Sequence, residues 1–185
     1  MAYRNGTYVA FHANGTNYPI HSDIKYYNMI KAWSEKSDDE FTIINSHDKT
    51  AAVRDSSSKE TLRNRLKERL RNSKNLVLII GETTKFDDDW VPFEIEYAVD
   101  VCKIPLIVTY VGIELGIQNA SDLSAKWPPS LKKRIDEGTA HAIHIPFRKT
   151  PIYSAVRQFN HNNLPNGYGL GIYSRETYKM WNIAI

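Results

Sequence analysis

The chain has 185 residues, of which 42% are hydrophobic and 24% are charged, as expected of a single globular domain with a substantial core. Its 24 Lys and Arg residues against 21 Asp and Glu residues give a net charge of +3, a surplus too small to predict nucleic acid or an anionic membrane as a partner. A single cysteine, Cys102, excludes an internal disulfide framework. With no signal-peptide stretch and no transmembrane run, we expect a cytoplasmic protein.

Hydrophobic periodicity predicts strands and helices that alternate along the chain. In chain order we expect strand 7–12, helix 22–36, strand 41–45, helix 57–71, strand 76–80, helix 90–102, strand 105–111, a short helix 130–136, strand 140–145 and helix 151–161. Uninterrupted apolar runs such as 76–80 and 105–111 are typical of parallel strands buried on both faces. Residues 163–185 are rich in Gly and Tyr and show no clear period.

This alternation predicts an α/β fold, because parallel strands need long crossover connections and the helices supply them. Five strands favour a flavodoxin-like parallel sheet of order 2-1-3-4-5 with helices on both faces. In such sheets ligands bind at the carboxyl ends of the strands, where the strand order reverses. We therefore expect a crevice between strands 1 and 3, lined by the loop after His12 and the loop before Trp90.

The helix after the third strand carries the first candidate site residue. Aspartates at 87–89 precede Trp90 and Pro92, a pattern typical of a helix start with acid at the positive end of the dipole. Glu94 follows Trp90 by one turn, so an indole and a carboxylate are expected to emerge together at the mouth of the crevice. No metal site is predicted, since His141 and His144 would face opposite sides of a strand.

Several segments, taken in order, resemble a known family. The stretch WVPFE resembles the W-x-x-x-E segment of TIR domains, and a longer ordered set resembles the TIR-like domains of Thoeris anti-phage defence: YVAFHANG, DIKYYNMIKAW, SHDKTAAVRDSSSKETLRNRLKERL, NLVLIIGETT, FEIEYA and IHIPF. The resemblance covers residues 7–159. It implies a TIR-like domain at 1–162 and a C-terminal tail at 163–185 that packs on the domain or on a partner.

The resemblance implies an enzyme that cleaves NAD, releases nicotinamide and makes a cyclic ADP-ribose isomer. This signal would activate a separate effector protein that depletes NAD, so NAD is a substrate and no cofactor is expected. Cationic nicotinamide leaves as a neutral molecule, so the reaction needs a negative group near the developing sugar cation rather than a general acid. Glu94 would supply that charge. Phe11 and Trp90 would stack on the substrate, and His12 and Asn14 would make polar contacts.

Two other functions stay open. One is a TIR-like interaction module without catalysis, in which Glu94 is structural and the loop of Arg54 and Asp55 mediates binding or self-association, as the corresponding loop does in TIR domains. In many TIR domains that loop has Pro-Gly after Arg-Asp, whereas serines follow here. The other is an enzyme similar to nucleoside deoxyribosyltransferases, whose chemistry also uses a carboxylate on a related sheet.

Overall fold

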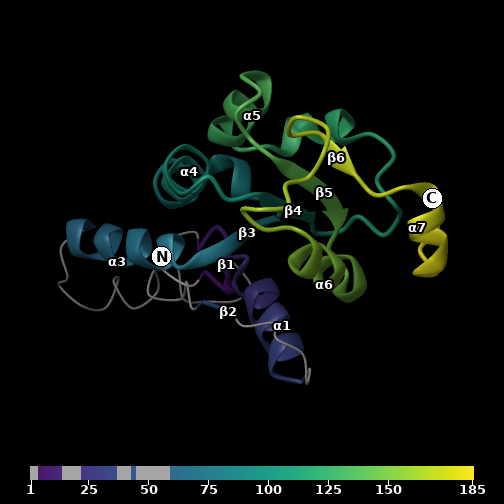
Figure 1. The fold of residues 1–185 in the computed structure, drawn as a ribbon, viewed down its shortest axis with the longest axis horizontal. Coiled ribbons are helices and arrows are strands. Elements are labelled where there is room, and N and C mark those ends of the chain that lie inside the picture. The colour runs from purple at the N-terminus through teal and green to yellow at the C-terminus, as the bar shows by residue number, and fades with distance from the viewer. Residues whose placement is uncertain (1–3, 14–21, 37–42, 45–58) are drawn as a thin grey trace.

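A computed structural model describes residues 4–13, 22–36, 43–44 and 59–185. Its centre is a parallel sheet of order β2-β1-β3-β4-β5-β6 (Figure 1). The strands are β1 (Gly6–Ala10), β2 (Ile43–Ile44), β3 (Ser73–Ile80), β4 (Leu106–Tyr110), β5 (Ala142–Pro146) and β6 (Gly171–Ile172). Every neighbouring pair runs parallel, so the carboxyl ends of the strands share one edge of the sheet.

Helices cover both faces of this sheet (Figure 1). The described helical segments are α1 (Ile24–Glu35), α3 (Lys59–Arg71), η2 (Thr84–Phe86), α4 (Trp90–Glu96), η3 (Tyr97–Cys102), η4 (Ala120–Lys126), α5 (Pro129–Asp136), α6 (Lys149–Gln158) and α7 (Arg175–Met180). Apolar side chains of α3, α4 and α5 form the core on one face, and those of α1 and α6 form the core on the other. The predicted α/β class, with a parallel sheet between two helical layers, is confirmed.

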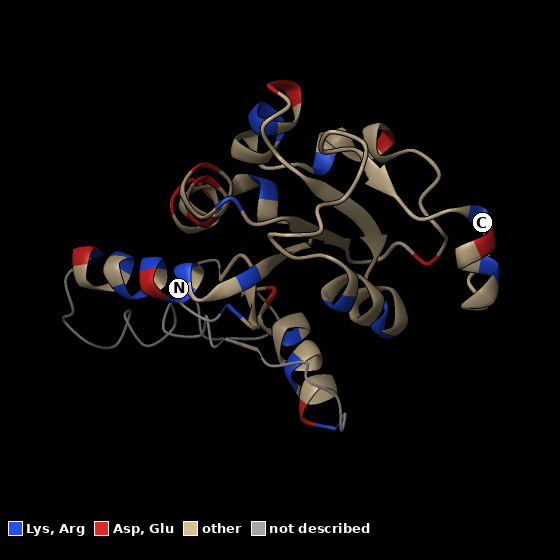
Figure 2. Ribbon diagram, in the orientation of Figure 1, with Lys and Arg blue, Asp and Glu red and all other residues tan. Residues whose placement is uncertain are grey.

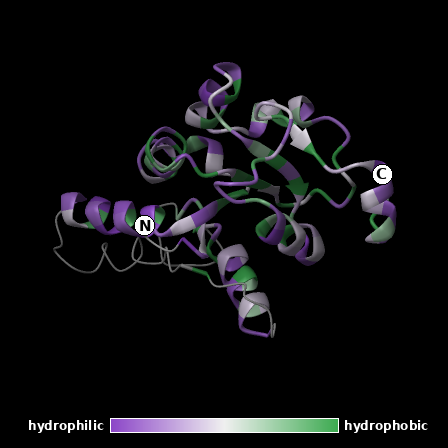
Figure 3. Ribbon diagram, in the orientation of Figure 1, coloured by the Kyte–Doolittle hydropathy of each residue, from purple (hydrophilic) through white to green (hydrophobic). Residues whose placement is uncertain are grey.

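Strand residues alternate between the two cores because successive side chains point to opposite faces. In β1, Tyr8 and Ala10 belong to the core with α3 and α4. Val9 and the following Phe11 belong to the core with α1 and α6. Figure 3 shows the hydrophobic residues gathered on the central strands, and every residue of β1 is buried. This alternation decides which predicted site residues can meet.

The third strand begins earlier than predicted because polar residues pack inside it. Asn75 is fully buried in β3, and its side-chain amide donates to the carbonyl oxygens of Val156 at 3.1 Å and Phe159 at 2.7 Å. These bonds anchor the end of α6 to the sheet. A buried amide with satisfied donors is compatible with a central strand, which an apolar-run criterion does not detect.

The tail adds a sixth strand to the five predicted. Gly171 and Ile172 of β6 pair with Ile143 and His144 of β5. A Cβ atom at Gly171 would lie 2.7 Å from the carbonyl oxygen of Ala142, so glycine allows the close approach of the two strands. The helix α7 then buries Tyr178, and residues 171–185 pack on the same body as the rest of the sheet.

The predicted helix at 90–102 changes its winding halfway. The α-helical part α4 ends at Glu96, and η3 continues as a π-helix to Cys102, where Lys103 adopts a left-handed φ of 55°. The first two residues of the helix predicted at 57–71 lie outside the described residues, and the described part is α3. Within the described ranges, no helix combines the length and the hydrophobicity needed to cross a membrane.

Candidate functional site

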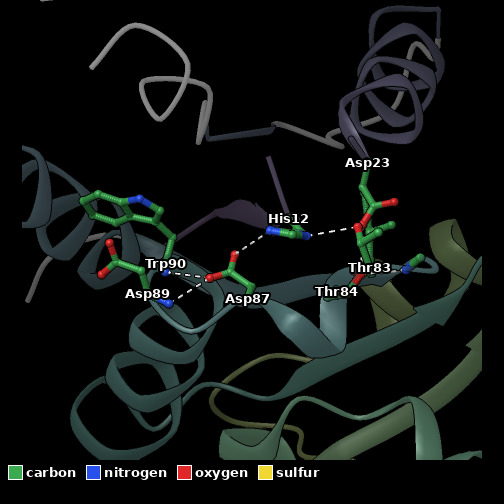
Figure 4. Close-up of polar contacts among 9 residues, drawn as sticks. His12, Asp23, Thr83, Thr84, Asp87, Asp89 and Trp90 are labelled. Carbon is green, nitrogen blue, oxygen red and sulfur yellow. Dashed lines mark hydrogen bonds and ion pairs between the residues drawn. The ribbon is translucent and has the colours of Figure 1, made fainter. Parts of the chain in front are cut away.

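A group of polar side chains joins the loops that follow β1 and β3. We call His12, Asp23, Thr83, Thr84 and Asp87 the strand-end cluster (Figure 4). His12 lies just after β1, and its Nδ1 is 3.0 Å from the Thr83 hydroxyl. Its Nε2 faces Asp87 Oδ2 at 4.0 Å. The imidazole therefore bridges two loops at the carboxyl edge of the sheet, where ligands bind in folds of this type.

The other half of the strand-end cluster is a buried carboxylate. The Thr84 hydroxyl donates to Asp23 Oδ2 at 2.8 Å and accepts the backbone N–H of Gly81, also at 2.8 Å. Burial raises the pKa of Asp23, and the hydrogen bond from Thr84 opposes this effect. A Cβ atom at Gly81 would lie 2.0 Å from Asp23 Oδ1, so only glycine leaves room for this carboxylate.

Asp87 fixes the start of α4. Its Oδ1 accepts the backbone N–H groups of Asp89 and Trp90, each at 2.9 Å (Figure 4). Asp89 in turn pairs with Lys59 at 2.7 Å and with Arg63 at 3.1 Å, both on the basic helix α3 (Figure 2). The Lys59 ammonium also lies 5.9 Å from the centre of the Trp90 ring. The aspartates before the helix thus tie α4 to α3 and to the loop after β1.

Glu94 lies beneath α4, not at the mouth of a crevice as predicted. Its exposed fraction is 0%, and its Oε1 accepts a hydrogen bond of 2.5 Å from the Tyr8 hydroxyl in the middle of β1. The physical reason is helical spacing, because Val91, Glu94 and Ile95 fall at i, i+3 and i+4 and all face the sheet. Glu94 therefore occupies the stripe that packs on the sheet.

Tyr8 is the residue that the sequence reasoning missed. Burial raises its pKa well above the ordinary value for a phenol, and the negative charge of Glu94 raises it further. The phenol therefore stays protonated and donates to the carboxylate. The alternation of side chains along β1 could have indicated this contact, since Tyr8 and Phe11 must face opposite cores.

The remaining predicted site residues are divided between different places. Phe11 is buried on the opposite face of the sheet and stacks on Tyr27 of α1 with ring centres 5.1 Å apart, so it does not meet Glu94. The His12 imidazole and the backbone N–H of Trp90 both contact Asp87 at the carboxyl edge. Asn14 lies outside the described residues, as do Arg54 and Asp55.

His144 is engaged in the core. Its Nε2 is 2.8 Å from the Gly169 carbonyl oxygen and its Nδ1 is 2.6 Å from the Tyr110 hydroxyl, which also accepts the Trp127 indole N–H at 2.7 Å. Burial lowers the pKa of His144 to about 4. Among the residues that the structure describes, no group of three or more His, Cys, Asp or Glu side chains is placed to hold a metal ion.

A parallel sheet with helices on both faces, a polar cluster at the ends of β1 and β3, and a Trp90–Glu94 segment opening α4 define the class as an α/β domain with a candidate site at its carboxyl edge. A family model described as "Thoeris protein ThsB, TIR-like domain" matches residues 8–114, which is more than half of the chain. The chain belongs to this family of anti-phage defence TIR-like domains. The matched stretch contains His12, Asp87 and Glu94.

Proposed function

We propose that this chain cleaves NAD, releases nicotinamide and closes the remaining nucleotide into a cyclic ADP-ribose isomer that serves as a diffusible signal. Membership in the Thoeris TIR-like family supports this function. The single observation that carries it at residue level is the fully buried Glu94 carboxylate, held by Tyr8 between α4 and the sheet. The signal activates a separate effector of the same defence system, which depletes cellular NAD.

Cleavage of the bond between ribose and nicotinamide needs only one carboxylate. The bond between ribose C1′ and the nicotinamide nitrogen breaks with its electron pair on nitrogen, so nicotinamide leaves neutral and needs no general acid. The sugar carbon becomes cationic, and a fixed negative charge stabilises it more strongly where water is excluded. Because Glu94 is fully buried, substrate binding has to open access to its carboxylate before this charge can act.

Ring closure requires a hydroxyl group of the second ribose to be held close to C1′. A hydroxyl oxygen of the second ribose forms the new bond to C1′, and its proton passes to solvent. The folded substrate has to present this hydroxyl before water arrives, which a shaped site achieves by holding both ends of the molecule. His12, at the carboxyl edge of the sheet, offers a polar group for this purpose, and the Trp90 ring lies near Lys59 of α3.

A second candidate function is a TIR-like interaction module without catalysis. The observation that favours it is the same burial, since a carboxylate with no exposed surface and a short hydrogen bond to Tyr8 also suits a purely structural role. In that case the chain acts by binding a partner or a second copy, and Glu94 holds α4 on β1.

Product analysis in cells separates the two functions. Lysates of phage-infected cells that carry the wild-type chain, Glu94→Gln or Glu96→Gln are incubated with NAD or with nucleosides, and products are identified by mass. Glu96 is the matched control because it lies two positions along the same helix with a side chain 53% exposed. We expect nicotinamide and a cyclic product from NAD with the wild type and the control, and neither with Glu94→Gln. Equal products from Glu94→Gln, or none from the wild type, would contradict the proposal.

A further inference from the structure

We propose that Tyr8 is a positioning residue for the Glu94 carboxylate in NAD cleavage, an inference that rests on the proposed function. The Tyr8 hydroxyl donates to Glu94 Oε1 at 2.5 Å, and both side chains are fully buried. The two residues are 86 positions apart in the sequence and come from β1 and α4. The bond therefore fixes the carboxylate relative to the sheet rather than within its own helix.

The direction of this hydrogen bond is set by its surroundings. The pKa of Tyr8 is raised well above its usual range, first by burial and then by the charge of Glu94. Arg69 of α3 acts in the opposite direction, and Tyr27 of α1 acts in the same direction as Glu94. Tyr8 therefore remains a donor at neutral pH, and Glu94 Oε1 is the acceptor.

The hydrogen bond from Tyr8 to Glu94 should affect the chemical step of the reaction rather than substrate binding. A hydrogen bond donated to a carboxylate favours its charged form, and only the charged form stabilises a sugar cation. The Tyr8 hydroxyl donates such a bond to Glu94 Oε1 and holds this oxygen in one direction. Because the cation exists only during the chemical step, losing the donor should lower kcat and leave the KM for NAD almost unchanged.

The test is Tyr8→Phe, which removes the hydroxyl and keeps the ring. The matched control is Tyr97→Phe, because the Tyr97 hydroxyl is buried in the same core and has no hydrogen-bond partner among the described residues. Initial rates of nicotinamide release are measured over a range of NAD concentrations in extracts of infected cells, at matched amounts of full-length protein. We expect Tyr8→Phe to lower kcat roughly 10- to 100-fold with KM within about twofold, and Tyr97→Phe to change neither.

A second variant restores a donor at the same place. The residue 4-aminophenylalanine, introduced at position 8, keeps the ring and offers an N–H group to Glu94, so most of the lost kcat should return. This variant also answers the question if Tyr8→Phe does not fold. The role of Tyr8 would be wrong if folded Tyr8→Phe kept the wild-type kcat, or if folded 4-aminophenylalanine protein recovered no activity. The proposed function would still stand in either case if Glu94→Gln had lost activity. An inactive wild type would overturn both.

Discussion

Replacing His144 by glutamine should make the stability of the fold less sensitive to acid. In the folded chain His144 is fully buried on β5, and its Nε2 bonds to the Gly169 carbonyl oxygen at 2.8 Å. A carbonyl only accepts, so Nε2 carries the proton, and Nδ1 accepts from the Tyr110 hydroxyl at 2.6 Å. A second proton on the imidazole would displace this donor, and burial also disfavours the charge.

The magnitude follows from the two pKa values. Burial lowers the pKa of folded His144 from 6.5 to about 4. Well above pH 6.5 the imidazole is uncharged in both the folded and the unfolded chain, so its contribution to stability is fully present. Below pH 6.5 the imidazole is protonated in the unfolded chain but not in the folded chain, so the free energy of unfolding falls until about pH 4. The gap between these two values corresponds to about 3 kcal/mol.

Urea unfolding of the wild type and of His144→Gln at pH 7, 5.5 and 4 measures this effect. At pH 7 the variant should be less stable by roughly 1–3 kcal/mol, because its amide replaces the bonds of the imidazole imperfectly. Between pH 7 and pH 4 the difference between the two proteins should change by about 3 kcal/mol in favour of the variant. Carboxylates that titrate in the same range cancel in this difference. A difference independent of pH would refute the reasoning.

Three further substitutions test the packing around the site, each by urea unfolding at neutral pH. Gly81→Ala should cost roughly 1–3 kcal/mol, because its Cβ would lie 2.0 Å from the Asp23 carboxylate, and an unchanged midpoint would contradict that close approach. Asp87→Ala should cost about 1 kcal/mol through loss of the two backbone bonds at the start of α4, whereas Asp88→Ala, at an exposed neighbour, should cost little. Leu66→Ala should cost roughly 2–5 kcal/mol, since this side chain is fully buried between α3 and the sheet, and a loss below 1 kcal/mol would show that the core is not packed as described.

The layers of the fold follow from local patterns in the sequence. Apolar runs such as Leu76–Ile80 and the stripe Leu62, Leu66 and Leu70 predict buried strands and amphipathic helices, and the structure places both as expected. The β6 strand could not be predicted in this way. It has only two residues, and it forms because Gly171 lets the backbone approach β5, which is a long-range contact without a local period.

The sequence predicts the place of the candidate site better than the contacts of its residues. The sequence indicated which loops meet at the carboxyl edge, and His12 and Trp90 lie there in contact with Asp87. The spacing of Glu94 with Val91 and Ile95 places it on the packed stripe of α4, but it does not identify Tyr8, 86 residues away on another element, as a partner of the carboxylate. A polar side chain on the buried face of a helix needs a hydrogen-bond partner, and the folded structure identifies that partner.

The most direct test of the central claim measures the catalytic and the structural role of Glu94 on the same preparations. Nicotinamide release at saturating NAD and the free energy of unfolding are determined for the wild type, Glu94→Gln and the exposed control Glu96→Gln. If Glu94 supplies the charge that stabilises the sugar cation, Glu94→Gln loses release by at least about 100-fold while the folded protein persists, and Glu96→Gln keeps it. If folded Glu94→Gln releases nicotinamide at the wild-type rate, the carboxylate is structural and the proposed mechanism is wrong.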